Sequence, residues 1–157
     1  MVRILFALLL LQISCFSEEG VYRNLEKRVK YFNSANFEGI EFNRLYIREL
    51  EYIRKGDFGV LEGSETILTG LYTNYLYIYD NGKVLFFASE KPNPKVNLYT
   101  GTFDGILYRK KNQMFIDWIV KTKMSLGFGT YNSHKIKVIN GKIHMQFDRY
   151  CYVYRPL

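Results

Sequence analysis

Two cysteines and two histidines are the residues of this chain that bear on nucleophilic or metal chemistry. Cys151 alternates with tyrosines in YCYVY (150–154), which is typical of a small buried residue that faces inward from a strand. A catalytic cysteine needs a basic partner in an electropositive setting, and the sequence around Cys151 offers none. His134 and His144 lack the spacing of a zinc site. We therefore expect no catalytic residue, no metal and no cofactor.

Three aspartates in strand-like segments are the remaining candidates for acid–base chemistry. Asp104, Asp117 and Asp148 have no spacing that marks a catalytic pair. The fragment Gly127-Phe128-Gly129 lies inside a strand-like run, where it indicates a bulge or close packing and not a phosphate loop. The sequence thus predicts a binding or structural protein and not an enzyme.

Cys15 has the most specific chemical context in the chain. It follows a positive start and the apolar run 4–11, which is too short to span a membrane and is typical of an export signal. The sequence LQISC (11–15) resembles a bacterial lipobox, whose cysteine is lipidated and begins the mature chain. The alternative is ordinary cleavage after Ser17, which would release a soluble secreted protein. We predict lipidation at Cys15 and attachment to a membrane of the bacterial cell envelope.

Composition and periodicity favour a β-rich domain behind this anchor. Tyr (14) and Phe (12) are abundant, and both favour strands. Residues 21–33 have helical spacing, whereas 42–53 fit either a helix or a strand. From residue 66 onward, turn signals separate further segments to give roughly eight strands, enough to close a small barrel. We predict a signal peptide at 1–14, a tether with a short helix at 15–40 and a β-barrel-like domain at 41–157.

The segment 74–89 predicts a β-hairpin with two apolar faces. Asn81-Gly82 is typical of a two-residue type I′ turn. That turn would place three tyrosines on one face together with Val84, Phe86 and Ala88. One face belongs to the core, and the other is either covered by residues 21–53 or exposed. The candidate surface for a small apolar ligand or an envelope protein consists of Tyr75, Tyr77, Tyr79 and Phe86.

The segment 134–148 predicts a second hairpin, which turns at Asn140-Gly141 for the same reason. This register pairs Ile136 with Met145 on an apolar face that also holds His134. His144 falls on the opposite, polar face. Trp118, the only tryptophan, alternates with apolar residues and is expected in the core.

The later part of the chain is similar to a group of small bacterial lipoproteins with a lipocalin-like barrel. In that group a Gly-x-Tyr strand leads into a hairpin, and here Gly129 and Tyr131 stand in the strand. The hairpin positions are matched by Ile136, Val138, Gly141 and Ile143. The resemblance implies a small up-and-down barrel or curved sheet and an N-terminal anchor. The early Gly-x-Trp signature of true lipocalins is absent, so their ligand chemistry is not carried over.

The formal net charge of +7 is scattered along the chain. No recognisable nucleic-acid-binding module accompanies it, so we expect no nucleic-acid partner. The sequence as a whole predicts an exported, lipid-anchored β-protein that binds a small apolar ligand or a protein partner. A structural or assembly module is the alternative.

Overall fold

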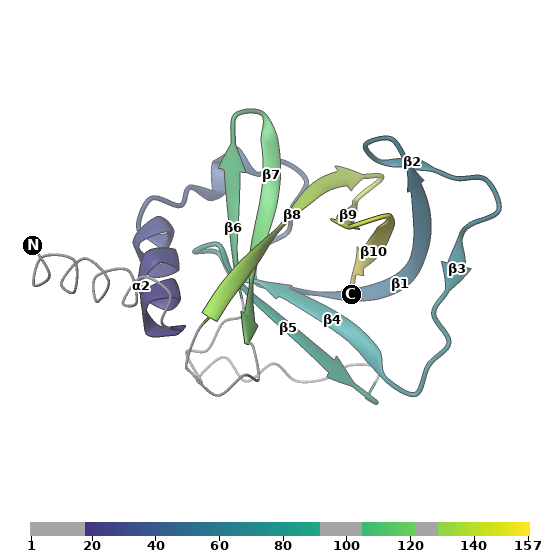
Figure 1. Cartoon of the computed structure of the whole chain (residues 1–157), viewed down its shortest axis with the longest axis horizontal. Helices are drawn as coiled ribbons and strands as arrows, with labels where there is room; N and C mark the ends of the chain where they lie inside the picture. Colours follow the sequence, from purple (N-terminus) through teal and green to yellow (C-terminus); the bar gives the residue numbers. More distant parts are fainter. Residues whose placement is uncertain (1–17, 92–104, 122–128) are drawn as a thin grey trace, which may run out of the picture.

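The computed structural model describes residues 18–91, 105–121 and 129–157 (Figure 1). In this part of the chain, eight antiparallel strands close into a barrel, which confirms the predicted fold class. The helical elements are α2 (Glu18–Val29) and the short 3-10 helix η1 (Ser34–Asn36). The strands are β1 (Arg44–Lys55), β2 (Gly59–Val60), β3 (Thr66–Ile67), β4 (Thr73–Ile78), β5 (Lys83–Ser89), β6 (Gly105–Lys110), β7 (Gln113–Lys121), β8 (Gly129–Ile139), β9 (Lys142–Phe147) and β10 (Tyr150–Pro156).

The barrel is an up-and-down meander that β1 closes. Consecutive strands pair from β4 to β10, and β1 joins the two ends of this series by pairing with both β4 and β10. The two-residue strands β2 and β3 pair with β1 outside the ring. The sequence pattern of residues 42–53 fits either a helix or a strand. In the structure, most of this segment belongs to β1, the strand that closes the barrel.

The hairpin of β8 and β9 has the predicted turn and register. Ile139 pairs with Lys142, so the turn contains two residues. Asn140 and Gly141 have φ angles of +51° and +74°, as a type I′ turn requires. Asparagine and glycine tolerate these angles better than other residues, which is why the register could be predicted.

The hairpin of β4 and β5 departs from the predicted register by one residue. Tyr79 donates its N–H to the carbonyl of Lys83 at 2.9 Å, so three residues form the loop. Positive φ occurs at Gly82 (+80°) and not at Asn81, whose side chain instead accepts a hydrogen bond from the N–H of Lys83. This is a type I turn followed by a left-handed glycine, the usual three-residue alternative.

The shift changes which side chains share a face. Tyr75 pairs with Phe87 and Tyr77 with Leu85, and these four residues face outward. Phe86 lies opposite Leu76 and faces the barrel interior. A one-residue slip exchanges the two faces of a strand, because successive side chains alternate. The three tyrosines and Phe86 therefore do not share one face, contrary to the predicted register.

One end of the barrel is filled by the segment between α2 and β1. Phe32 and Phe37 stack with ring centroids 4.9 Å apart, and Phe42 meets Phe37 edge-on at 6.4 Å. These rings pack against the interior core of the strands. The buried core comprises Phe37, Ile40, Tyr46, Leu76, Ile78, Val84, Leu107, Ile116, Ile136, Ile143, Met145 and Tyr154.

The helix α2 lies against the outside of the barrel, where it contacts β8 and β6 (Figure 1). Leu25 of α2 is fully buried. Arg28 Nη1 donates a hydrogen bond of 2.6 Å to Asp117 Oδ2 on β7. The Asp117 side chain is 1% exposed and that of Arg28 is 42% exposed. Asp117, one of the three aspartates considered for catalysis, thus ties the helix to the barrel wall.

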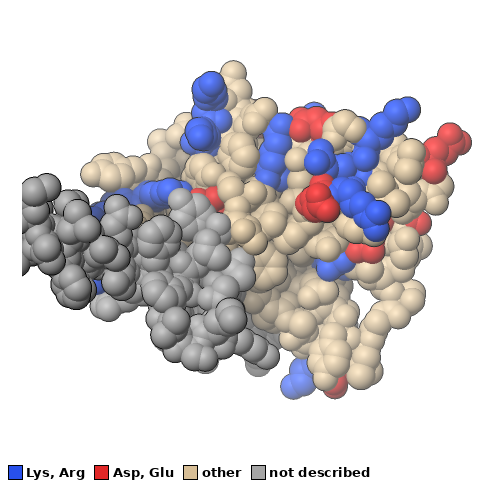
Figure 2. Space-filling view, in the orientation of Figure 1, with Lys and Arg blue, Asp and Glu red and all other residues tan. Residues whose placement is uncertain are grey.

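Basic and acidic side chains are interspersed on the face drawn in Figure 2. Lys135 Nζ lies 2.6 Å from Asp57 Oδ1, and Glu49 forms ion pairs with both Lys142 and Arg155. Several basic side chains on this surface are therefore paired with acidic ones. Within residues 18–91, 105–121 and 129–157, no helix combines the length and the apolar character needed to cross a membrane.

Candidate functional site

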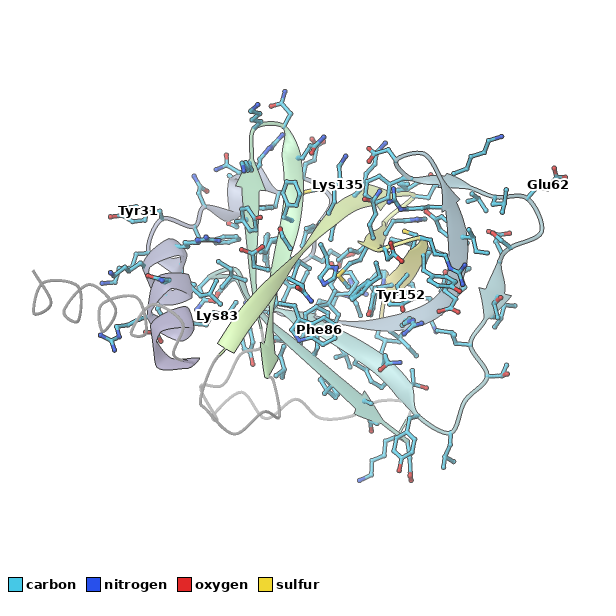
Figure 3. All side chains as sticks on the ribbon, viewed as in Figure 1. Tyr31, Glu62, Lys83, Phe86, Lys135 and Tyr152 are labelled. Carbon is cyan, nitrogen blue, oxygen red and sulfur yellow. The ribbon has the colours of Figure 1, made fainter. Side chains whose placement is uncertain are left out.

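The barrel interior contains a pocket of about 250 Å³ toward the end opposite the rings of Phe32, Phe37 and Phe42. It lies where β4 begins and where β5 and β9 end. Residues of six strands line it, and most of them face inward, and most carry aromatic side chains. The lining includes Arg48, Phe86, Trp118, Phe147, Tyr152 and Tyr154. Figure 3 labels Phe86 on β5 and Tyr152 on β10.

The rings of this pocket are held by contacts with one another. Phe86 and Trp118 stack with centroids 4.3 Å apart and planes 12° apart. Phe147 meets Trp118 edge-on at 5.9 Å and lies 4.6 Å from the Tyr152 ring. Such pairs are more favourable than contact area alone would give, so the pocket wall is preorganised. It offers flat apolar surfaces to a ligand of matching chemistry.

Arg48 places a positive charge in this aromatic wall. Its guanidinium carbon lies 3.6 Å from the centroid of the Tyr152 ring, which is cation–π geometry. One nitrogen, Nη2, donates to the carboxylate of Glu51. The Nε atom is buried and has no hydrogen-bond acceptor among the described residues.

A β-bulge in β1 brings Arg48 and Glu51 to the same face. The register with β10 shifts between Arg48 and Leu50, so Arg48 opposes Tyr154 and Glu51 opposes Tyr152. Without the extra residue, normal alternation would place positions 48 and 51 on opposite faces. The bulge therefore creates an ion pair inside the barrel.

The two histidines lie on opposite faces of the sheet, which confirms the prediction from the β8–β9 register. His134 stacks on Phe147 inside the barrel with centroids 3.8 Å apart, and its Nδ1 lies 3.0 Å from the carbonyl oxygen of Gln146. A carbonyl only accepts, so Nδ1 carries the hydrogen. Burial lowers the pKa of His134 and keeps the ring neutral.

His144 belongs to a small cluster on the outer face of the barrel. Its Nδ1 lies 3.0 Å from the hydroxyl of Tyr52, which packs with Cys151 and Val153. Cys151 is buried as predicted, although it faces outward and its tyrosine neighbours Tyr150 and Tyr152 face inward. Burial raises the pKa of the Cys151 thiol, which disfavours the reactive thiolate.

Of the predicted surface residues, Tyr75 and Phe86 line the pocket, whereas Tyr77 and Tyr79 do not. Tyr75 and Tyr77 are buried on the outer face, and the Tyr75 hydroxyl donates to the carbonyl of Lys91 at 2.8 Å. Tyr79 packs edge-on against Tyr77 with centroids 4.8 Å apart. Asp148 lies in the β9–β10 turn with φ of +48°, and not within a strand as predicted. Cys15, the signal peptide 1–14, Asp104 and Gly127 lie outside the described residues.

The chain matches no known protein family, no curated protein and no solved structure. Its function must therefore be inferred from the site itself. Within the part of the chain that the structure describes, no three His, Cys, Asp or Glu side chains are grouped as metal ligands would be.

Sequence reasoning missed Arg48 and the inward-facing tyrosines of β10. Arg48 lies in a segment whose secondary structure was ambiguous, and the bulge beside it has no clear sequence signal. Tyr152 and Tyr154 alternate with apolar residues that are buried on the other face, so alternation alone did not identify the inner face. The high aromatic content of the chain was the one sequence signal that pointed to an aromatic pocket.

Proposed function

We propose that this chain is a lipid-anchored protein of the bacterial cell envelope whose barrel binds a small apolar ligand without catalysis. The aromatic pocket inside one end of the barrel is the observation that carries the binding part. Pockets for small ligands are concave and mostly apolar, with a few polar groups, and the lining here has that character. The lipobox-like sequence ending at Cys15 supports the anchor.

A blocking substitution tests the binding part. Ala88 lines the pocket from β5, and Ala88→Phe would place a ring in its entrance. We expect this variant to weaken binding of an uncharged probe such as octanamide, followed by the fluorescence of Trp118. Ser89→Phe is the matched control, because the neighbouring residue of a strand points to the opposite face. Equal binding by both variants and the unmodified chain would contradict binding in this pocket.

The anchor is tested by intact mass spectrometry of the protein extracted from membranes. We expect a chain that begins at Cys15 and carries the mass of attached lipid. A chain that begins at Glu18 without lipid would replace this proposal by that of a soluble secreted protein. The measurement is independent of the pocket.

A second function, that of an assembly module, is favoured by apolar side chains on the segment between β2 and β4. Leu71 and Ile67 are 75% and 74% exposed, and Tyr72 is 60% exposed. Clustered exposed apolar residues often mark protein contacts. A photo-crosslinker at position 71 would capture an envelope protein under this hypothesis, whereas one at the exposed Lys137 would not.

A further inference from the structure

The charge on Arg48 bears on the chemistry of the ligand. The Arg48 side chain is 15% exposed and faces a pocket whose wall is otherwise largely aromatic. Moving a guanidinium away from water is costly unless its charge and its donors find partners. An apolar residue would complete the wall of a pocket for an uncharged hydrocarbon at lower cost.

Part of the hydrogen-bonding capacity of Arg48 is unused among the described residues. Glu51 accepts from Nη2, whereas Nε is buried without an acceptor among the described residues. A guanidinium has five N–H donors in a planar fork that matches a carboxylate. Glu51 thus holds Arg48 in place and satisfies only part of its hydrogen-bonding capacity.

Arg48 also borders a hollow on the outer surface of the barrel. The pairing of β1 with β4 ends at Ile47 and Tyr75, and β1 pairs with β3 from Leu50 onward. A second hollow, of about 370 Å³, follows the segment 66–73 on the outer surface. Arg48 and Asn74 line both hollows.

We propose that the pocket binds a small apolar carboxylate, with the carboxylate on Arg48 and the hydrocarbon among Phe86, Trp118 and Phe147. This inference rests on the binding function proposed above. A cavity of about 150 Å³ holds one benzene ring, so the interior pocket holds one substituted ring or a short acyl chain.

The test compares two probes with the same hydrocarbon chain, one with a charged head group and one with a neutral head group. Octanoate and octanamide have the same chain length, and Trp118, the only tryptophan, reports occupancy of the pocket by its fluorescence. We expect octanoate to bind the full chain about tenfold more tightly or better, because charge-assisted hydrogen bonds are the stronger ones. Equal affinity for the two probes would overturn the inference.

A substitution assigns the preference to Arg48. Arg48→Gln is expected to abolish the preference, so that this variant binds octanoate no more tightly than octanamide. Lys55→Gln removes the same charge from an exposed position of β1 outside both hollows and is expected to change neither affinity. Retained octanoate preference in Arg48→Gln would overturn the inference while the binding function stands. No fluorescence response to either probe in the unmodified chain would refute the binding function itself.

Discussion

Removal of the Arg28 side chain should destabilise the protein more than its exposure suggests. Arg28 is 42% exposed, but its partner Asp117 is 1% exposed and would remain as a buried carboxylate. One oxygen of Asp117, Oδ1, already has no hydrogen-bond partner among the described residues. Loss of one member of a fully buried ion pair costs about 3–5 kcal/mol. Water can reach the vacated arginine position, so we expect about 2 kcal/mol for Arg28→Ala.

Substitution of the partner residue, Asp117, should reduce stability less than Arg28→Ala does. Asp117→Asn removes the buried charge and leaves Arg28 where water can solvate it, so we expect a loss of about 1 kcal/mol or less. In the double variant, the neutral amide that replaces the Asp117 carboxylate no longer requires a cation. Part of the stability lost in Arg28→Ala should therefore return, and the two substitutions are expected to be strongly non-additive.

The free energy of unfolding is measured by urea titration with far-UV circular dichroism for the two single variants and the double variant. Lys27→Ala is the control, since Lys27 is an exposed cation of the same helix. We expect this control to change stability by less than about 0.5 kcal/mol. A free energy of unfolding for Arg28→Ala equal to that for Lys27→Ala would contradict a structural role of the Arg28–Asp117 pair. A double variant no more stable than Arg28→Ala would contradict it as well.

Three further substitutions or conditions test the fold. Gly82→Ala should destabilise the barrel by more than about 1 kcal/mol in the same titration, because φ is +80° and the new Cβ would lie 2.3 Å from a ring carbon of Phe32. Ile116→Ala, at a fully buried core position, should lower the free energy of unfolding by about 2–5 kcal/mol. Burial lowers the pKa of both His134 and His144, so the unfolded chain binds protons that the folded chain does not. Stability should therefore fall as pH drops below about 6.5, and glutamine at both positions should flatten this dependence in urea titrations at pH 7.5 and 5.5.

Local turn chemistry explains where the sequence predicted the fold and where it did not. Asn140-Gly141 forms the expected two-residue turn, and the faces of β8 and β9 follow from it. Asn81-Gly82 is the same dipeptide, but this loop includes Asp80 as a third residue. Each face of β4 therefore lies beside the face of β5 opposite to the predicted one. Both turns suit this dipeptide, so the choice depends on tertiary contacts, such as that of Phe32 with Gly82.

The pocket depends on features that act over long distances in the sequence. Phe86 and Trp118 stack across the interior although 31 residues separate them along the chain. Arg48 enters the pocket because β1 carries a bulge and because β10 supplies the Tyr152 ring. Strand patterns predict that such side chains face inward or outward, but they do not predict which of them meet.

If Cys15 is lipidated as proposed, only a short linker separates the lipid from α2, which begins at Glu18. Two residues, Phe16 and Ser17, separate the two positions, and three steps of fully extended chain reach at most about 11 Å. A long flexible tether would let a domain sample a wide volume above a membrane. Here the helix is fixed to the barrel wall through Leu25 and Arg28, so the barrel would lie close to the lipid surface. Apolar molecules that partition into the membrane would then be within its reach.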